Sequence, residues 1–115
     1  MTKTILILGA GKSAYNLISY LSDNSQNLEI EIKLISDKTP EYIKEIQNIK
    51  FLKIDISDKI QISKQINGAY IVVSLLPPFL HYKVALICAE YSVNMITASY
   101  LDDKIKSLNK KFKKN

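Results

Sequence analysis

The feature that most constrains this chain is a glycine-containing turn between an apolar run and a helical pattern. Residues 4–8 favour a β-strand, Gly9-Ala10-Gly11 follows at once, and a helical pattern begins directly afterwards, with Ala14 in its first turn. A strand, a tight glycine turn and a helix in succession form the context of the G-x-G-x-x-G/A fingerprint, which binds a dinucleotide pyrophosphate. The alternative is a tight turn between strand and helix that binds no ligand.

Each small residue of this turn has its own physical role. Gly9 allows the sharp turn, Gly11 lets the backbone approach a pyrophosphate, and Ala14 lets the helix lie against the strand. The helix N-terminus favours negative charge, through its unpaired N–H groups and its dipole. Lys12 and Ser13 stand in this first helical turn, where they could reach phosphate, although Lys12 could equally remain a solvated lysine. We therefore predict a pyrophosphate site at Gly9, Ala10, Gly11, Lys12 and Ser13.

The length and the cysteine content narrow the class of protein. A chain of 115 residues predicts one domain, residues 1–115, that can bury a core without disulfides or metals. Cys88 is the single cysteine, which excludes an intrachain disulfide and fits a reducing compartment. No stretch reaches the roughly 18 apolar residues of a membrane span, and the run from Ile5 does not resemble a signal peptide. We expect a soluble, cytoplasmic protein with no membrane partner.

The net charge of +5 raises the question of nucleic-acid binding. All sixteen basic residues are lysines, and four of them lie in the last six residues. Without that tail the charge is close to neutral. Base recognition favours arginine forks, and the chain has no arginine. Nucleic acid is therefore not an expected partner.

Five β-type runs alternate with helical patterns along the chain. The predicted strands are residues 4–8, 29–36, 51–54, 69–75 and 94–98. The predicted helices are residues 12–23, a short one after Pro40, one from about 57 to 68, 79–91 and 102–112, with a polar loop at 24–27. This alternation predicts right-handed βαβ crossovers. The predicted fold class is α/β: a doubly wound parallel sheet, Rossmann-like, with strand order 3-2-1-4-5 and helices on both faces.

Polar residues at the carboxyl ends of these strands are the candidate ligand contacts, because such sheets bind ligands there. Asp37 follows the second strand, roughly 20 residues beyond the glycines, where the fingerprint places an acidic residue on the ribose 2′-OH. A carboxylate there accepts hydrogen bonds from the ribose hydroxyl groups and repels a 2′-phosphate, which favours NAD over NADP. The neighbouring Lys38 could soften that preference. Alternatively, Asp37 only opens the turn into Thr39 and Pro40.

Asp55 and Ile56 follow the third strand. In this geometry the pair would flank the adenine, the carboxylate or a backbone group on its amino nitrogen and the aliphatic side chain on its ring face. Alternatively, Asp55 caps the next helix, a role that Ser57 or Asp58 could fill equally well.

The fourth and fifth strands lead into the remaining candidates. The stiff loop Leu75-Leu76-Pro77 should pass beneath the nicotinamide half of a dinucleotide, and Thr97 and Ser99 place hydroxyl groups at the same rim. His81 is the only histidine, without metal-ligand partners in the pattern, and we expect it at the surface or the pocket edge. The sequence shows no nucleophile–base pair, so we predict no catalytic residue and no metal site.

Three segments carry a family resemblance. Residues 5–11 (ILILGAG), 73–81 (VSLLPPFLH) and 96–102 (ITASYLD) resemble the N-terminal NAD(P)-binding domain of saccharopine dehydrogenases in order and spacing. The resemblance implies a Rossmann fold and an oxidoreductase acting on CH–NH bonds in lysine metabolism. It also implies cofactor contacts at residues 11–13, Asp37, Asp55, Ile56, residues 75–77, Thr97 and Ser99. Family members that use NADP tend to carry a basic residue where Asp37 stands, so the resemblance implies NAD, with NADP possible.

The resemblance also bears on domain organisation. In the family, a second domain binds the amino-acid substrate and supplies most of the catalytic environment. The resemblance thus implies the N-terminal part of a longer enzyme, which binds dinucleotide but does not turn over alone. The alternative is a stand-alone dinucleotide-sensing module that regulates a partner. A surface left open by a missing domain would favour a homodimer.

Overall fold

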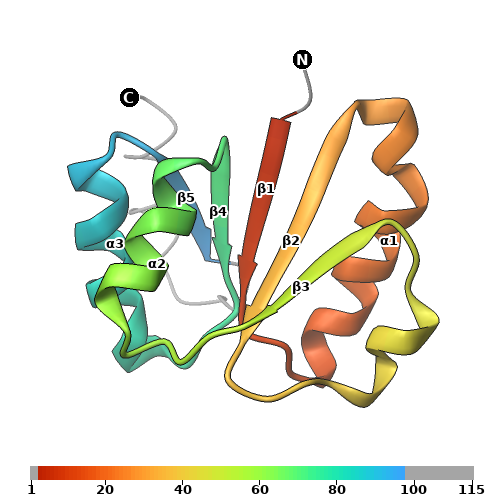
Figure 1. Cartoon of the computed structure of the whole chain (residues 1–115), viewed down its shortest axis with the longest axis horizontal. Helices are drawn as coiled ribbons and strands as arrows, with labels where there is room; N and C mark the ends of the chain where they lie inside the picture. Colours follow the sequence, from red (N-terminus) through yellow and green to blue (C-terminus); the bar gives the residue numbers. More distant parts are fainter. Residues whose placement is uncertain (1–2, 98–115) are drawn as a thin grey trace.

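The computed structural model describes residues 3–97 as a five-stranded parallel sheet with helices on both faces (Figure 1). The strand order is β3-β2-β1-β4-β5, which confirms the predicted doubly wound topology. In chain order the elements are β1 (Lys3–Leu8), α1 (Lys12–Leu28), β2 (Ile30–Ser36), the 3-10 helix η1 (Glu41–Glu45), β3 (Ile49–Lys53), α2 (Lys59–Asn67), β4 (Ile71–Ser74), α3 (Pro78–Glu90) and β5 (Asn94–Thr97). Ser99 and the predicted helix 102–112 lie outside the described residues.

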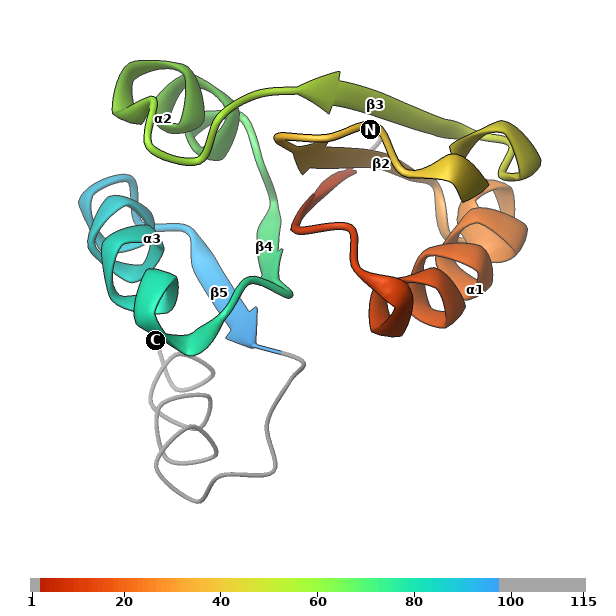
Figure 2. The same ribbon diagram turned by 90° about the horizontal axis from the view of Figure 1, so that it is seen from below.

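The central strand β1 is covered on both faces. Leu6, Ile7 and Leu8 are all fully buried, as expected for a continuous apolar run in the middle of a parallel sheet. Because successive strand side chains point to opposite faces, Leu6 and Leu8 belong to one core and Ile7 to another. Viewed from below, α1 lies on one side of the sheet and α2 and α3 on the other (Figure 2).

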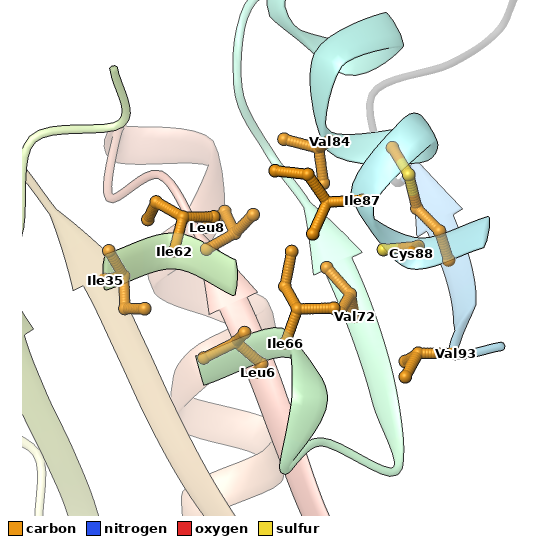
Figure 3. Close-up of a cluster of buried hydrophobic side chains, with 11 residues drawn as sticks. Leu6, Leu8, Ile35, Ile62, Ile66, Val72, Val84, Ile87, Cys88 and Val93 are labelled. Carbon is orange, nitrogen blue, oxygen red and sulfur yellow. The ribbon is translucent and has the colours of Figure 1, made fainter. Parts of the chain in front are cut away.

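The helices α2 and α3 contribute residues at helical spacing to the core that they form with the sheet (Figure 3). Ile62 and Ile66 of α2 are buried one turn apart, and Val84 and Cys88 of α3 repeat the same spacing. Burial raises the pKa of the Cys88 thiol to about 12, so this thiol stays protonated and inert at neutral pH. Within residues 3–97, no helix has the length and apolar character needed to cross a lipid bilayer.

The first helix is longer than predicted. Helix α1 continues to Leu28, through the segment 24–27 that was predicted as a polar loop. No glycine or proline stands between Gly11 and Pro40, and polar residues alone do not interrupt a helical hydrogen-bond ladder. The helix ends at Leu28, and the next residue, Glu29, leaves the helical region with a φ of 53° and turns the chain into β2. The short helix predicted after Pro40 is a 3-10 helix, and other element ends differ from prediction by a few residues.

Gly9 brings two loops into contact at the carboxyl edge of the sheet. Its φ of 98° is left-handed, and a Cβ atom there would lie 3.1 Å from the carbonyl carbon and oxygen of Leu75. The Gly9 N–H donates to the Ile35 carbonyl at 2.9 Å, while the Leu75 N–H donates to the Leu8 carbonyl at 2.8 Å. Only glycine satisfies both the backbone angle and this close approach. Gly9 therefore packs the turn after β1 against the loop after β4.

Gly11, two residues later, is in the opposite situation. No heavy atom lies within 4 Å of the position that a Cβ would take, and its φ is not in the left-handed region. The fold itself therefore does not require glycine at this position.

Substitution of these two glycines should separate their roles. We expect Gly9→Ala to lower the free energy of unfolding by about 1–3 kcal/mol, because it combines backbone strain with a steric conflict at Leu75. Gly11→Ala is the matched control and should change that free energy by less than about 1 kcal/mol. Urea unfolding followed by circular dichroism measures both, and equal midpoints for the two variants would contradict this account of Gly9.

Candidate functional site

The carboxyl ends of the strands lie along the lower edge of the sheet in Figure 1. A cleft of about 710 Å³ is lined by residues of this carboxyl edge. It lies where the strand order switches between β1 and β4. The structure brings nine of the predicted contact residues to its lining: Gly9, Ala10, Gly11, Asp37, Lys38, Ile56, Leu75, Leu76 and Pro77. It adds neighbours on the same strand ends that the sequence analysis did not select: Ile35, Ser36, Pro40, Ile54, Pro78 and Leu80.

The glycine turn joins the cleft to α1. The Ala14 N–H donates to the Gly11 carbonyl at 2.9 Å, and Ala14 is fully buried where α1 packs on the sheet. Lys12 and Ser13 form the first residues of α1, directly after the cleft-lining Gly11. The first N–H groups of a helix have no intrahelical acceptor, so this end of the helix offers donors beside the cleft.

Tyr42, on η1, is a site residue that the sequence analysis missed. Its Oη donates a hydrogen bond of 3.1 Å to the carbonyl of Ala10, in the middle of the glycine turn. Its ring meets the ring of Tyr15 edge to face, with centroids 5.1 Å apart and planes at 76°. Burial raises the pKa of Tyr42, so its hydroxyl remains a donor at neutral pH. The two bonded residues are 32 positions apart, and no local sequence pattern reports such a contact.

The loop after β2 carries the two charged residues of the cleft. Asp37 and Lys38 are both exposed and both line it. The Lys38 N–H donates to Ser36 Oγ at 3.3 Å, which shapes the loop locally. Among residues 3–97, with the side chains of residues 12, 13 and 24–28 left aside, the Asp37 carboxylate makes no hydrogen bond or ion pair. The carboxylate is therefore available to a ligand and is not used to open the turn into Thr39.

Asp55 is not brought to the cleft, although its neighbour Ile56 is. The Asp55 carboxylate accepts hydrogen bonds from the Ser57 N–H at 2.9 Å and from Ser57 Oγ at 2.8 Å. These bonds, the backbone one first, lower the pKa of Asp55 because they stabilise the charged form. The N-cap of α2 is Asp58, which accepts from the Gln61 N–H at 3.2 Å. Asp55 thus serves the turn after β3.

His81 was predicted at the surface or the pocket edge. It is buried, which excludes the surface, and it lies beside the cleft-lining residue Leu76, which agrees with the pocket edge. It stands on α3 in phase with Val84 and Cys88, and that helix face packs on the sheet. Burial lowers the pKa of His81, and a hydrogen bond with the backbone of Leu76 partly opposes that shift. The imidazole therefore supports the loop that lines the cleft.

Thr97 also lies away from the cleft lining. Thr97 of β5 is in register with Ser74 of β4, and both hydroxyl oxygens are buried. In the part of the chain from residue 3 to residue 97, no three histidine, cysteine or acidic side chains gather as metal ligands would. The cleft combines backbone groups, apolar side chains, one carboxylate and one ammonium group, an arrangement suited to binding an elongated polar ligand.

Comparison with known proteins agrees with this geometry. The family described as "Saccharopine dehydrogenase NADP binding domain" matches residues 5–115. The chain is 34% identical over 111 residues to the mitochondrial alpha-aminoadipic semialdehyde synthase of Mus musculus, covering 94% of this chain and 12% of that protein. It is 27% identical over 106 residues to saccharopine dehydrogenase [NADP(+), L-glutamate-forming] of Schizosaccharomyces pombe, covering 91% of this chain and 23% of that protein.

Solved structures show the same fold. The apo saccharopine dehydrogenase (L-Glu forming) of Saccharomyces cerevisiae superposes with a TM-score of 0.71 at 22% identity, over 92% of this chain and 24% of that one. The chain thus spans between about an eighth and a quarter of these relatives. They lend no support to the alternative of a stand-alone sensing module, and cytoplasmic localisation stays a prediction, since the mouse relative is mitochondrial. With its strand order, its glycine turn and the match over residues 5–115, the chain belongs to the saccharopine dehydrogenase NADP-binding domain family.

Proposed function

We propose that the cleft binds a nicotinamide dinucleotide, with its pyrophosphate on Gly9-Ala10-Gly11 and the N-terminus of α1. The observation that carries the proposal is the open space at Gly11. This residue lines a cleft of about 710 Å³, and no heavy atom lies within 4 Å of the position that its Cβ would take. Glycine at a position where the fold does not need it is explained by a ligand that must reach the backbone closely. The volume lies within the range of about 300–1,000 Å³ that is common for small-molecule sites.

The other cleft residues have roles that follow from their strand ends. Asp37 would accept hydrogen bonds from the adenosine ribose, since its carboxylate is exposed in the cleft and makes no described bond to the protein. Ile54 and Ile56 would form an apolar wall for the adenine. The loop Leu75-Leu76-Pro77 would support the nicotinamide half. The predicted contacts Asp55 and Thr97 are not among the residues that line this cleft, and Ser99 remains a prediction.

The balance of charge supports NAD(H) as the preferred dinucleotide. The Asp37 carboxylate repels a 2′-phosphate, whereas the Lys38 ammonium attracts one. Asp37 directly follows β2, at the position that meets the ribose in this fold, and we propose that it outweighs Lys38. The family description and the S. pombe relative both name NADP, so Lys38 is the residue that would allow NADP as a second ligand.

We further propose that this domain serves an oxidoreductase acting on a CH–NH bond of an amino-acid derivative in lysine metabolism. The supporting observation is the family, together with the names of the longer relatives. A bound nicotinamide ring supplies hydride transfer. The described residues bind and orient the dinucleotide, while the amino-acid substrate is held by parts of such an enzyme beyond this domain.

Calorimetric titration of the chain with NADH and with NADPH tests the proposed binding. We expect saturable binding of NADH, and Gly11→Ala should weaken it by about tenfold, equivalent to about 1.4 kcal/mol, because the added methyl group keeps the pyrophosphate from the backbone. The urea midpoint of the same variant, expected to be unchanged, is the control for folding. No binding of either dinucleotide at millimolar concentration would overturn the proposal.

The ratio of the NADH and NADPH affinities tests the role of Asp37. Asp37→Ala should lower the preference for NADH by roughly tenfold, since a hydrogen bond to a charged group contributes about 1.5–3 kcal/mol. Lys38→Ala is the matched substitution in the same loop and should raise the preference. An affinity ratio that does not respond to Asp37→Ala would remove this carboxylate from the ribose site.

A further inference from the structure

The glycine turn is held from outside the cleft by a side chain far along the sequence. Tyr42 Oη donates to the Ala10 carbonyl at 3.1 Å, and Tyr42 itself packs with the core under α1. We propose that Tyr42 is a positioning residue that aims the Gly11 N–H at the pyrophosphate of the bound dinucleotide. This inference rests on the proposed function and assigns a role within it to a residue of η1.

The geometry of the peptide bond links the two ends of this argument. The peptide between Ala10 and Gly11 is trans, like every described peptide bond, so its C=O and N–H point in opposite directions. With the Ala10 carbonyl held by Tyr42, the Gly11 N–H points away from Tyr42 and from the core under α1. Gly11 is exposed and lines the cleft, whereas Tyr42 packs against the core under α1 and is not among the lining residues. The Tyr42 bond thus presents an N–H donor, and not a carbonyl oxygen, to the ligand.

The hydrogen bond from Tyr42 to Ala10 matters because the next residue is Gly11. A glycine that leaves room for a phosphate also lets its own peptide rotate easily, because it has no Cβ to restrict it. Rotation would replace the Gly11 N–H in the cleft by the Ala10 carbonyl oxygen, which repels a phosphate. Phosphate oxygens require donors. The hydrogen bond from Tyr42 disfavours the orientation of the peptide that would place the carbonyl oxygen in the cleft, and it leaves the space at Gly11 open.

Tyr42 is itself fixed from two directions. Its ring contacts Tyr15 of α1 edge to face at 5.1 Å. Its helix begins after Pro40, which lines the cleft, and the Ile43 N–H donates to the Pro40 carbonyl at 3.1 Å. The same short helix therefore connects the ribose loop after β2 with the glycine turn after β1. Both predicted contact regions for the dinucleotide are positioned by one element.

The test is the variant Tyr42→Phe, which removes the hydroxyl group and keeps the ring against Tyr15. We expect NADH to bind about five- to tenfold more weakly, the effect of one hydrogen bond. In the absence of ligand, the Gly11 amide should shift in the ¹H–¹⁵N NMR spectrum. Tyr15→Phe is the matched control, because it removes a hydroxyl from the ring that meets Tyr42 edge to face and leaves the bond to Ala10 in place. This control should bind NADH as the wild type does, with an unmoved Gly11 amide.

The outcomes distinguish this inference from the function on which it rests. Wild-type protein that binds neither NADH nor NADPH would overturn the proposed function and the inference with it. Wild-type protein that binds NADH, together with a Tyr42→Phe variant of equal affinity, would overturn the inference alone. An equal loss of affinity in Tyr42→Phe and Tyr15→Phe would also overturn it, since the loss would then not be specific to the hydroxyl group that donates to Ala10.

Discussion

The close approach of Gly9 to the backbone of Leu75 is the contact on which the cleft depends. A Cβ at Gly9 would lie 3.1 Å from that backbone, so the turn after β1 and the loop after β4 meet without an intervening side chain. Two hydrogen bonds lie beside this contact: Gly9, just past β1, donates to Ile35 of β2, and Leu75, just past β4, donates to Leu8 of β1. At this contact the two loops meet through backbone atoms, and backbone N–H groups are the donors that a pyrophosphate requires.

The glycine turn meets two different requirements, internal packing and access for a ligand, at two different residues. Gly9 is needed for internal packing, whereas Gly11 faces open space and is needed only if a ligand approaches. Tyr42 adds a third element, because its bond to Ala10 holds the peptide between the two. Stability and ligand binding are thus divided among neighbouring residues, and they can be changed separately. In the proposed function, the described residues of the cleft bind and orient the dinucleotide, in keeping with a domain that spans only about an eighth to a quarter of its relatives.

Local patterns allowed the sheet and much of the cleft to be predicted from the sequence. The alternation of strands and helices predicts a parallel, doubly wound sheet, and the glycine turn after the first strand favours the order 3-2-1-4-5. Strand ends such as Asp37 then meet at one edge by topology alone. What could not be predicted depends on non-local or competing hydrogen bonds. Tyr42 reaches a carbonyl 32 residues away, Asp55 is retained by the adjacent Ser57, and His81 is buried because its helix phase places it against the sheet. The length of α1 was missed because polar residues resemble a loop in composition without breaking a helix.

The central claim is that a dinucleotide lies across this edge of the sheet, and mapping of NMR amide shifts during NADH titration tests it most directly. We expect saturable shifts that are largest in residues 9–11, 37–38 and 75–76. Little change is expected at Gly68 and Val93, which precede β4 and β5 at the opposite, amino edge of the sheet. Shifts gathered between α2 and α3, around Lys59, Lys83 and Glu90, would contradict it, as would the absence of any saturable shift.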